Sequence, residues 1–155
     1  MGRRFLIGAG RYAMGDDGIG LRVAEEIAAR GLDRGFEVVD LSGDATRLLD
    51  AFRPETERIL IVDALVGGRT PGDHVVFDPA ETVSDKALAG WSTHEGDLLR
   101  TIELGRRLGL PVPPIRVLGI EPACVTQGMD LSETLDRRLE DYLATALRLI
   151  GESWS

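Results

Sequence analysis

The sequence predicts an α/β fold built on a mostly parallel sheet. Short apolar segments typical of buried strands alternate with segments of helical spacing, which is the pattern of strand and crossover helix. The 155 residues suit one domain spanning 1–155, since no repeat or linker divides the chain. One strand, over 74–77, follows its predecessor after a short loop, so we expect it to run antiparallel.

The first half begins with a short buried strand over residues 4–9. Residues 19–30 then place apolar side chains at helical spacing, and Gly31 is a suitable stop. Apolar runs and a capping residue predict the rest of this half: strands over 36–41 and 58–64, and between them a short helix over 45–52 capped by Asp44.

The second half continues the alternation after the strand over 74–77. Residues 78–90 look irregular or weakly helical. A helix is expected over 96–108, with Ser92 or Thr93 as its cap. A last strand over 114–120 and one long amphipathic helix over 131–150, with Ser132 and Glu133 near its start, complete the prediction.

Composition narrows the classes of function. The net charge of −8 leaves no basic surface for nucleic acid, and no apolar run is long enough to span a bilayer. The apolar stretch near the N-terminus is too short for a signal peptide, so we expect a cytoplasmic protein. The single cysteine, Cys124, excludes an internal disulfide and a cysteine-rich metal site, and we expect it to be a small buried residue.

The loop over residues 8–20 has two halves that point to different functions. Gly8-x-Gly10-x-x-Ala13 after a strand matches the start of a dinucleotide-binding turn. Asp16 and Asp17 then follow, and two carboxylates repel a phosphate. The helix also begins late, and there is no second domain for a substrate. A nucleotide site therefore stays a minor alternative.

Three residues could instead form a metal site at one edge of the sheet. Asp17 lies just beyond the first strand, Asp63 lies at the end of the central strand, and His94 precedes a helix. Ligands gather at the carboxyl ends of parallel strands, and two carboxylates with one imidazole suit a divalent transition metal. Each residue alone also fits a plainer role: a helix cap for Asp17, a turn residue for Asp63, an exposed loop residue for His94.

The ordered motifs together resemble the hydrogenase maturation endopeptidases, which process the large subunit of nickel-containing hydrogenases. The Asp-Asp-Gly-x-Gly element is moderately specific, and the whole set in this order is highly specific. The matching segments are Gly8-Ala-Gly10, Gly15-Asp-Asp-Gly-Ile-Gly20, Asp63-Ala with Thr70-Pro-Gly72, Ser92-Thr-His94, and Gly119-Ile-Glu-Pro122.

The resemblance implies a three-layer α/β/α sandwich around a twisted, mostly parallel five-stranded sheet, of the phosphorylase/hydrolase-like kind. It implies metal ligation by Asp17, Asp63 and His94, with nickel supplied by the substrate. The implied reaction removes a short C-terminal extension from the nickel-loaded large-subunit precursor. Asp16 is then a supporting acid that orients Asp17, caps the helix or takes part in proton transfer. The general base stays open among Asp16, Asp17 and Asp63.

One position departs from the family pattern. The family usually has Asn after the second glycine of the first motif, and this chain has Arg11. A small amide is thereby replaced by a long cation, which either points to solvent or pairs with a nearby acid. A different function also stays open, that of a non-catalytic, metal-dependent chaperone or binding partner of a hydrogenase subunit.

Overall fold

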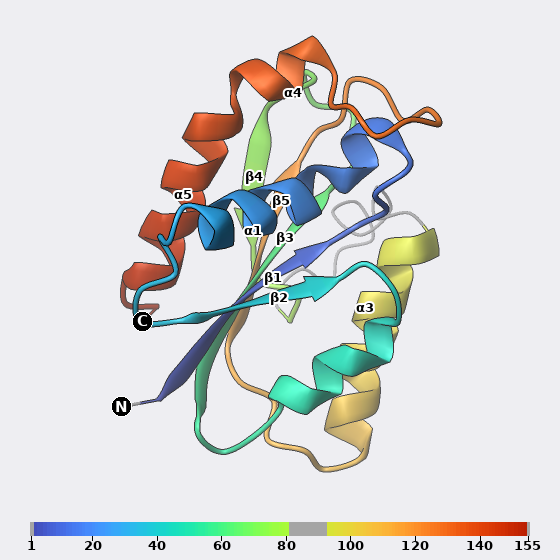
Figure 1. Cartoon of the computed structure of the whole chain (residues 1–155). Helices are drawn as coiled ribbons and strands as arrows, with labels where there is room; N and C mark the ends of the chain where they lie inside the picture. Colours follow the sequence, from blue (N-terminus) through green and yellow to red (C-terminus); the bar gives the residue numbers. More distant parts are fainter. Residues whose placement is uncertain (1, 81–92, 155) are drawn as a thin grey trace.

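A computed structural model describes residues 2–80 and 93–154 as one five-stranded sheet between two layers of helices (Figure 1). The strand order is β2-β1-β3-β5-β4, and only the β4–β5 pair is antiparallel. The strands are β1 (Arg3–Ala9), β2 (Glu37–Leu41), β3 (Thr56–Ala64), β4 (His74–Phe77) and β5 (Ile115–Ile120). The predicted α/β sandwich and the antiparallel strand are confirmed.

The helices cover the two faces of the sheet. In Figure 1, α1 (Ile19–Ala29) and α5 (Leu139–Gly151) lie on one side, and α3 (Thr93–Arg107) lies on the other. The 3₁₀ helix η2 (Ala45–Ala51) packs beside α3, and Asp44 caps it as predicted by accepting from the Thr46 N–H at 2.9 Å. The 3₁₀ helix η1 (Gly15–Gly18) connects β1 to α1, and α4 (Glu133–Arg137) precedes α5.

Strand β3 carries the centre of both cores. Leu60 and Val62 face the cluster formed with α1 and α5, whereas Ile59 and Ile61 face the cluster formed with η2 and α3. All four side chains are fully buried. A strand buried on both faces requires a continuous apolar run rather than an alternating one, and residues 59–62 supply such a run.

Helix α1 lies unusually close to the sheet because of Gly20. A Cβ atom at this position would lie 2.0 Å from the carbonyl oxygen of Val62 and 2.6 Å from that of Ala9. Any side chain here would force the helix away from the ends of β1 and β3. The glycine therefore sets the distance between the start of α1 and the carboxyl edge of the sheet.

The C-terminal helix differs from the prediction of one continuous helix over 131–150. The structure divides it into α4 and α5 at Arg138, whose φ of −100° and ψ of 3° leave the helical region. Two contacts hold this bend: Arg138 donates to Asp73 Oδ1 at 2.9 Å, and the Tyr142 hydroxyl donates to the Gly72 carbonyl at 2.6 Å. The apolar spacing runs through the break, so periodicity alone predicted one helix.

The remaining boundaries agree with the prediction to within two residues, except that α3 begins at Thr93, three residues before the predicted start at 96. The segment 81–90 and the side chains of Ser92 and Thr93 lie outside the described part, so the expectations for them stay predictions. None of the helices within residues 2–80 and 93–154 has the length and apolar character needed to cross a bilayer.

Candidate active site at the carboxyl edge of the sheet

Two buried carboxylates lie at the carboxyl edge of the sheet. Strands β1 and β3 are parallel neighbours, so the segments that follow them begin at the same edge. Asp17 lies in η1, directly after β1, and is 5% exposed, whereas Asp63 is the penultimate residue of β3 and is fully buried. Burying a carboxylate is costly without compensating partners, so these two side chains mark this edge as a built polar site.

The turn at Gly10 after β1 packs closely against the backbone of η1. Gly10 has a φ of +136°, and a Cβ on it would lie 2.1 Å from the carbonyl oxygen of Asp17. The close approach that a dinucleotide turn reserves for a pyrophosphate is thus taken by η1 itself, and α1 starts only at Ile19. The likeness to a nucleotide-binding turn has a structural explanation here.

The Asp17 carboxylate forms an ion pair with Arg11. The Arg11 Nε lies 2.7 Å from Asp17 Oδ2, and the Arg11 backbone N–H also donates to the Asp17 carbonyl at 3.4 Å. Of the two possibilities that the sequence left for Arg11, the structure shows the second, pairing with a nearby acid. The ion pair gives the buried Asp17 carboxylate a partner, which offsets part of the cost of burying it.

Asp63 is fixed by the end of its own strand. Its Oδ1 accepts from the backbone N–H of Ala64 at 2.8 Å, and in the sheet Asp63 stands opposite Gly119 of β5. The strand pairs on both sides, with β1 and with β5, so its position is rigid. A carboxylate at the end of a rigid central strand is suited to holding a ligand at a constant position.

The Asp16 carboxylate bonds to residues of the segment 121–132. It accepts from the backbone N–H groups of Ala123, Cys124 and Ser132 and from the Ser132 hydroxyl, at 2.7 to 3.0 Å. The Asp16 N–H in turn donates to the Cys124 carbonyl at 3.0 Å. Four donors on one carboxylate make Asp16 the tie between η1 and the segment 121–132, and this favours a positioning role over proton transfer.

Two residues of the site region have roles that the sequence reasoning did not assign. Buried Glu121 accepts at Oε1 from the N–H groups of Gly67 and Arg69, at 2.9 and 3.0 Å, and so holds the loop that follows β3. Ser132 caps α4 through the Leu135 N–H while donating to Asp16. A capping serine before a helix was visible in the sequence, but its second partner was not.

His94 belongs to the first turn of α3, which the structure places near the same edge. Leu98, one turn further on, packs in the cluster that contains Ala9 and Leu65, the residues at the ends of β1 and β3. The imidazole itself lies outside the described part of the chain. Among the side chains that are described, no group of three His, Cys, Asp or Glu residues is placed to hold a metal ion.

The donor chemistry at this edge suits a divalent cation. Carboxylate oxygens bind nickel, zinc and related ions when a nitrogen donor completes the site. The Arg11 guanidinium shows that a cation can reach Asp17 from the surface. The two aspartates supply ligand types that fit a metal ion, and metal ligation by Asp17, Asp63 and His94 stays a prediction.

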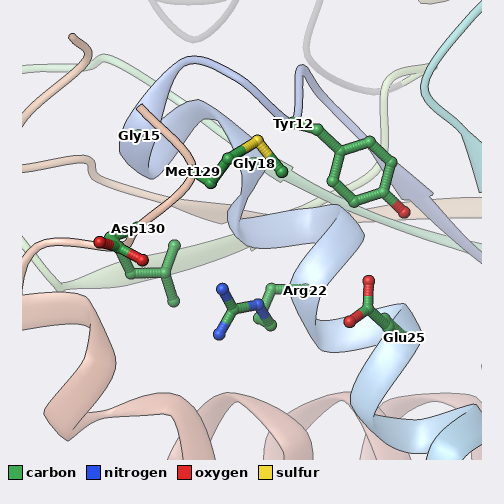
Figure 2. A pocket seen from close by; sticks show the side chains of 8 residues that line it. Tyr12, Gly15, Gly18, Arg22, Glu25, Met129 and Asp130 are labelled. Atoms are coloured by element: carbon green, nitrogen blue, oxygen red, sulfur yellow. The ribbon is translucent and has the colours of Figure 1, made fainter. Parts of the chain in front are cut away.

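A cavity of about 180 Å³ opens on the other side of η1. Figure 2 shows the Arg22 side chain extending from α1 between Asp130 and Glu25, with Met129 and Tyr12 above it. Gly15 and Gly18, which flank the two aspartates in the chain, form part of its wall. Met129 in the lining of this cavity is 61% exposed, so part of the cavity wall is apolar.

Cys124 differs from its prediction as a small buried residue. The structure places it on the surface, where its Sγ lies 3.3 Å from the Thr126 hydroxyl oxygen. Its backbone rather than its thiol serves the site, since the N–H and carbonyl both bond to Asp16. The segment 121–132 crosses η1 at the surface, which leaves no apolar core beside it for the side chain.

Comparison with known proteins agrees with this arrangement. The family model described as hydrogenase maturation protease matches residues 21–149. The solved structure of the hydrogenase maturating endopeptidase HybD from E. coli superposes with a TM-score of 0.77 at 22% identity, covering 96% of this chain and 94% of that one. The [NiFe] hydrogenase maturation protease HybD from Thermococcus kodakarensis gives a TM-score of 0.76 at 25% identity, over 96% and 99%.

A further relative is Protein FrxA from Pyrococcus furiosus, which is 27% identical over 145 residues, 90% of this chain and 98% of its own length. The fold and the edge site define an α/β sandwich domain with two buried carboxylates at the carboxyl edge of its sheet. The family match covers most of this domain, and the chain belongs to the hydrogenase maturation protease family. It is accordingly a peptidase, and its partner is a hydrogenase.

Proposed function

We propose that this peptidase removes a short C-terminal extension from the nickel-loaded precursor of a nickel-iron hydrogenase large subunit. The observation that carries the proposal is the pair of buried carboxylates, Asp17 and Asp63, at one edge of the sheet in a chain of this family. The cavity on the other side of η1, whose wall includes Gly15 and Gly18, offers a surface where part of the substrate could bind. The single cysteine of the chain is in keeping with a reaction in the cytoplasm, where thiols stay reduced.

In this proposal Asp17, Asp63 and His94 hold the nickel that the substrate brings. Bound nickel supplies a Lewis acid that polarises the scissile carbonyl or activates water. The chain's own task is to orient the peptide: the rigid end of β3 presents Asp63, and the tie through Asp16 presents Asp17. Holding the scissile bond beside the acids makes the attack effectively unimolecular.

The hydrogen bonds of Asp16 reduce the number of candidates for the general base. Asp16 already accepts four hydrogen bonds, so taking a proton from water would require several of them to break. Asp17 and Asp63 are the better candidates, because each has a carboxylate at the edge itself. We therefore assign Asp16 a positioning role and assign the general base to either Asp17 or Asp63.

The test is cleavage of a purified, nickel-loaded precursor, followed by mass spectrometry. Asp17→Asn, Asp63→Asn and His94→Ala should each lose at least about a hundredfold in rate, because removing one oriented group commonly costs that much. The exposed Asp50 lies on η2, away from the edge, so Asp50→Asn is the matched control and should cleave normally.

Circular dichroism should show the same secondary structure in all four variants. Normal cleavage by Asp17→Asn, Asp63→Asn and His94→Ala would exclude the proposed site. A stable complex with a precursor that is never shortened would instead support the alternative of a metal-dependent binding partner.

A further inference from the structure

We propose that Arg11 is a built-in competitor for the metal: its guanidinium occupies the Asp17 carboxylate in the resting protein and has to leave when a divalent metal ion binds. Free metal ions would then bind weakly, and a metal presented with additional ligands from a substrate would be favoured. The inference rests on the proposed function only for the source of that metal. The competition itself concerns this chain alone.

The first support is the geometry of the pair. The Arg11 Nε lies 2.7 Å from Asp17 Oδ2, which is the distance of a charge-assisted hydrogen bond. A metal ion that binds this oxygen needs the same lone pairs that the guanidinium uses. Since both partners carry positive charge, they also repel each other at this distance. Simultaneous binding at Oδ2 is therefore disfavoured, and the two cations exclude one another.

The second support is the difference in burial between the two partners. The Asp17 side chain is 7% exposed, whereas the Arg11 side chain is 44% exposed. The carboxylate is held in the protein and the cation approaches it from the surface. A long arginine side chain with nearly half its surface in water can swing away without disturbing the core, while Asp17 stays in place.

The third support is that the backbone of Arg11 is anchored independently of its side chain. The N–H of Arg11 donates to the Asp17 carbonyl at 3.4 Å, and η1 packs against the turn at Gly10. Departure of the guanidinium thus leaves the turn intact. Arginine keeps its charge at every relevant pH, so the guanidinium remains a competing cation under all conditions of the experiment.

The experiment is isothermal titration of the metal-free, full-length protein with nickel chloride alone, in the absence of any precursor. Arg11→Gln should bind nickel about tenfold more tightly than the wild type, equivalent to the loss of one competing charge-assisted hydrogen bond. Arg11→Ala should do the same, and it excludes an effect of the glutamine amide. Circular dichroism confirms that each variant is folded.

Two controls separate competition from a general effect of charge. Arg30 is an exposed arginine at the far end of α1, paired with Glu26 and Glu140, so Arg30→Gln changes the net charge equally and should leave nickel affinity unchanged. In an Asp17→Asn background, Arg11→Gln should have no effect, because the contested carboxylate is gone.

Equal or weaker nickel binding by both Arg11 variants would overturn the inference, and so would undetectable binding in wild type and variants alike. An affinity gain that persists in the Asp17→Asn background would also overturn it. Since no cleavage is measured, a failure here leaves the proposed peptidase activity standing. Conversely, loss of the proposed activity would leave a measured competition intact.

Discussion

Asp16 is the residue on which the shape of the site most depends. Substituting Asp16→Ala leaves the N–H groups of Ala123, Cys124 and Ser132 without their acceptor. We expect unfolding free energy to fall by about 3 kcal/mol, the range for losing charge-assisted hydrogen bonds in a buried setting. Ser132→Ala removes one donor and a helix cap, and should cost about 1 kcal/mol. Urea denaturation measures both, and equal losses would contradict the assigned role of Asp16.

The two tyrosines, Tyr12 and Tyr142, should ionise at a higher pH in the folded protein than in the unfolded chain. The hydrogen bond to Asp40 raises the pKa of Tyr12 to about 12, and burial raises the pKa of Tyr142 to about 12. Each folded-state pKa exceeds the ordinary value of 10.0, so their contribution to stability is complete below pH 10 and lost as pH rises toward 12. Absorbance at 295 nm should show little tyrosinate in the folded protein at about pH 11 and full ionisation in urea.

Tyr12→Phe provides the matching variant, since it removes the hydroxyl that bonds to Asp40 and keeps the ring. Its stability should fall less steeply between pH 10 and about 12 than that of the wild type. An unchanged slope would show that the Tyr12–Asp40 contact does not perturb the tyrosine.

At the scale of single residues, the sequence predicted which acids lie at the carboxyl edge of the sheet better than it predicted what those acids contact. The paired acids and the strand-end Asp63 stood out because their positions follow from local order along the chain. The partners of Asp16 lie 107 to 116 residues away, and no local pattern encodes such a contact. For Arg11 the residue type was informative, but only the folded turn decided between solvent and Asp17.

Among the elements, α1 is the one whose placement depends on a single small residue. Gly20→Ala would put a Cβ 2.0 Å from the Val62 carbonyl oxygen, far inside van der Waals contact with backbone. The helix has to move or the strand has to bend, and we expect a loss of about 3 kcal/mol or failure to fold. Gly43→Ala is the control, since nothing lies within 4 Å of a Cβ there. Thermal unfolding should separate the two clearly, and equal melting temperatures would show that α1 is not held this closely.

Element boundaries were predictable wherever periodicity and capping act locally. The strands and α1 follow from apolar spacing, and Asp44 capped η2 as expected. The break between α4 and α5 was missed because its cause is tertiary: Arg138 reaches Asp73, and Tyr142 reaches Gly72, both in the loop before β4. The spacing of apolar residues along one helix does not indicate a contact with another element.

For the whole molecule, the two cores share one sheet and should unfold together. Ile61 and Val62 are adjacent in β3 and face opposite clusters. Ile61→Ala and Val62→Ala should each lower the unfolding free energy by about 2 to 4 kcal/mol, the usual cost of deleting buried aliphatic groups. In both variants a single transition should be seen by circular dichroism and by tryptophan fluorescence. Two separated transitions would mean that the faces are independent.

The alternation of strands and helices predicted the class of architecture, and the short loop before residue 74 predicted the antiparallel strand. The order β2-β1-β3-β5-β4 was a different matter, because it depends on which crossovers pack best against each face. Asp17 and Asp63 lie at the same edge because that order makes β1 and β3 parallel neighbours.

The hydrogen bonds that join η1 to the segment 121–132 have a consequence for folding during translation. A chain emerges from the ribosome N-terminus first, so Asp16 is synthesised 116 residues before Ser132. Until that late segment arrives, the loop that presents Asp17 lacks its anchor. A nascent chain that ends before this segment therefore lacks the contacts that position Asp17, and we expect its site to assemble only after residue 132 has been synthesised.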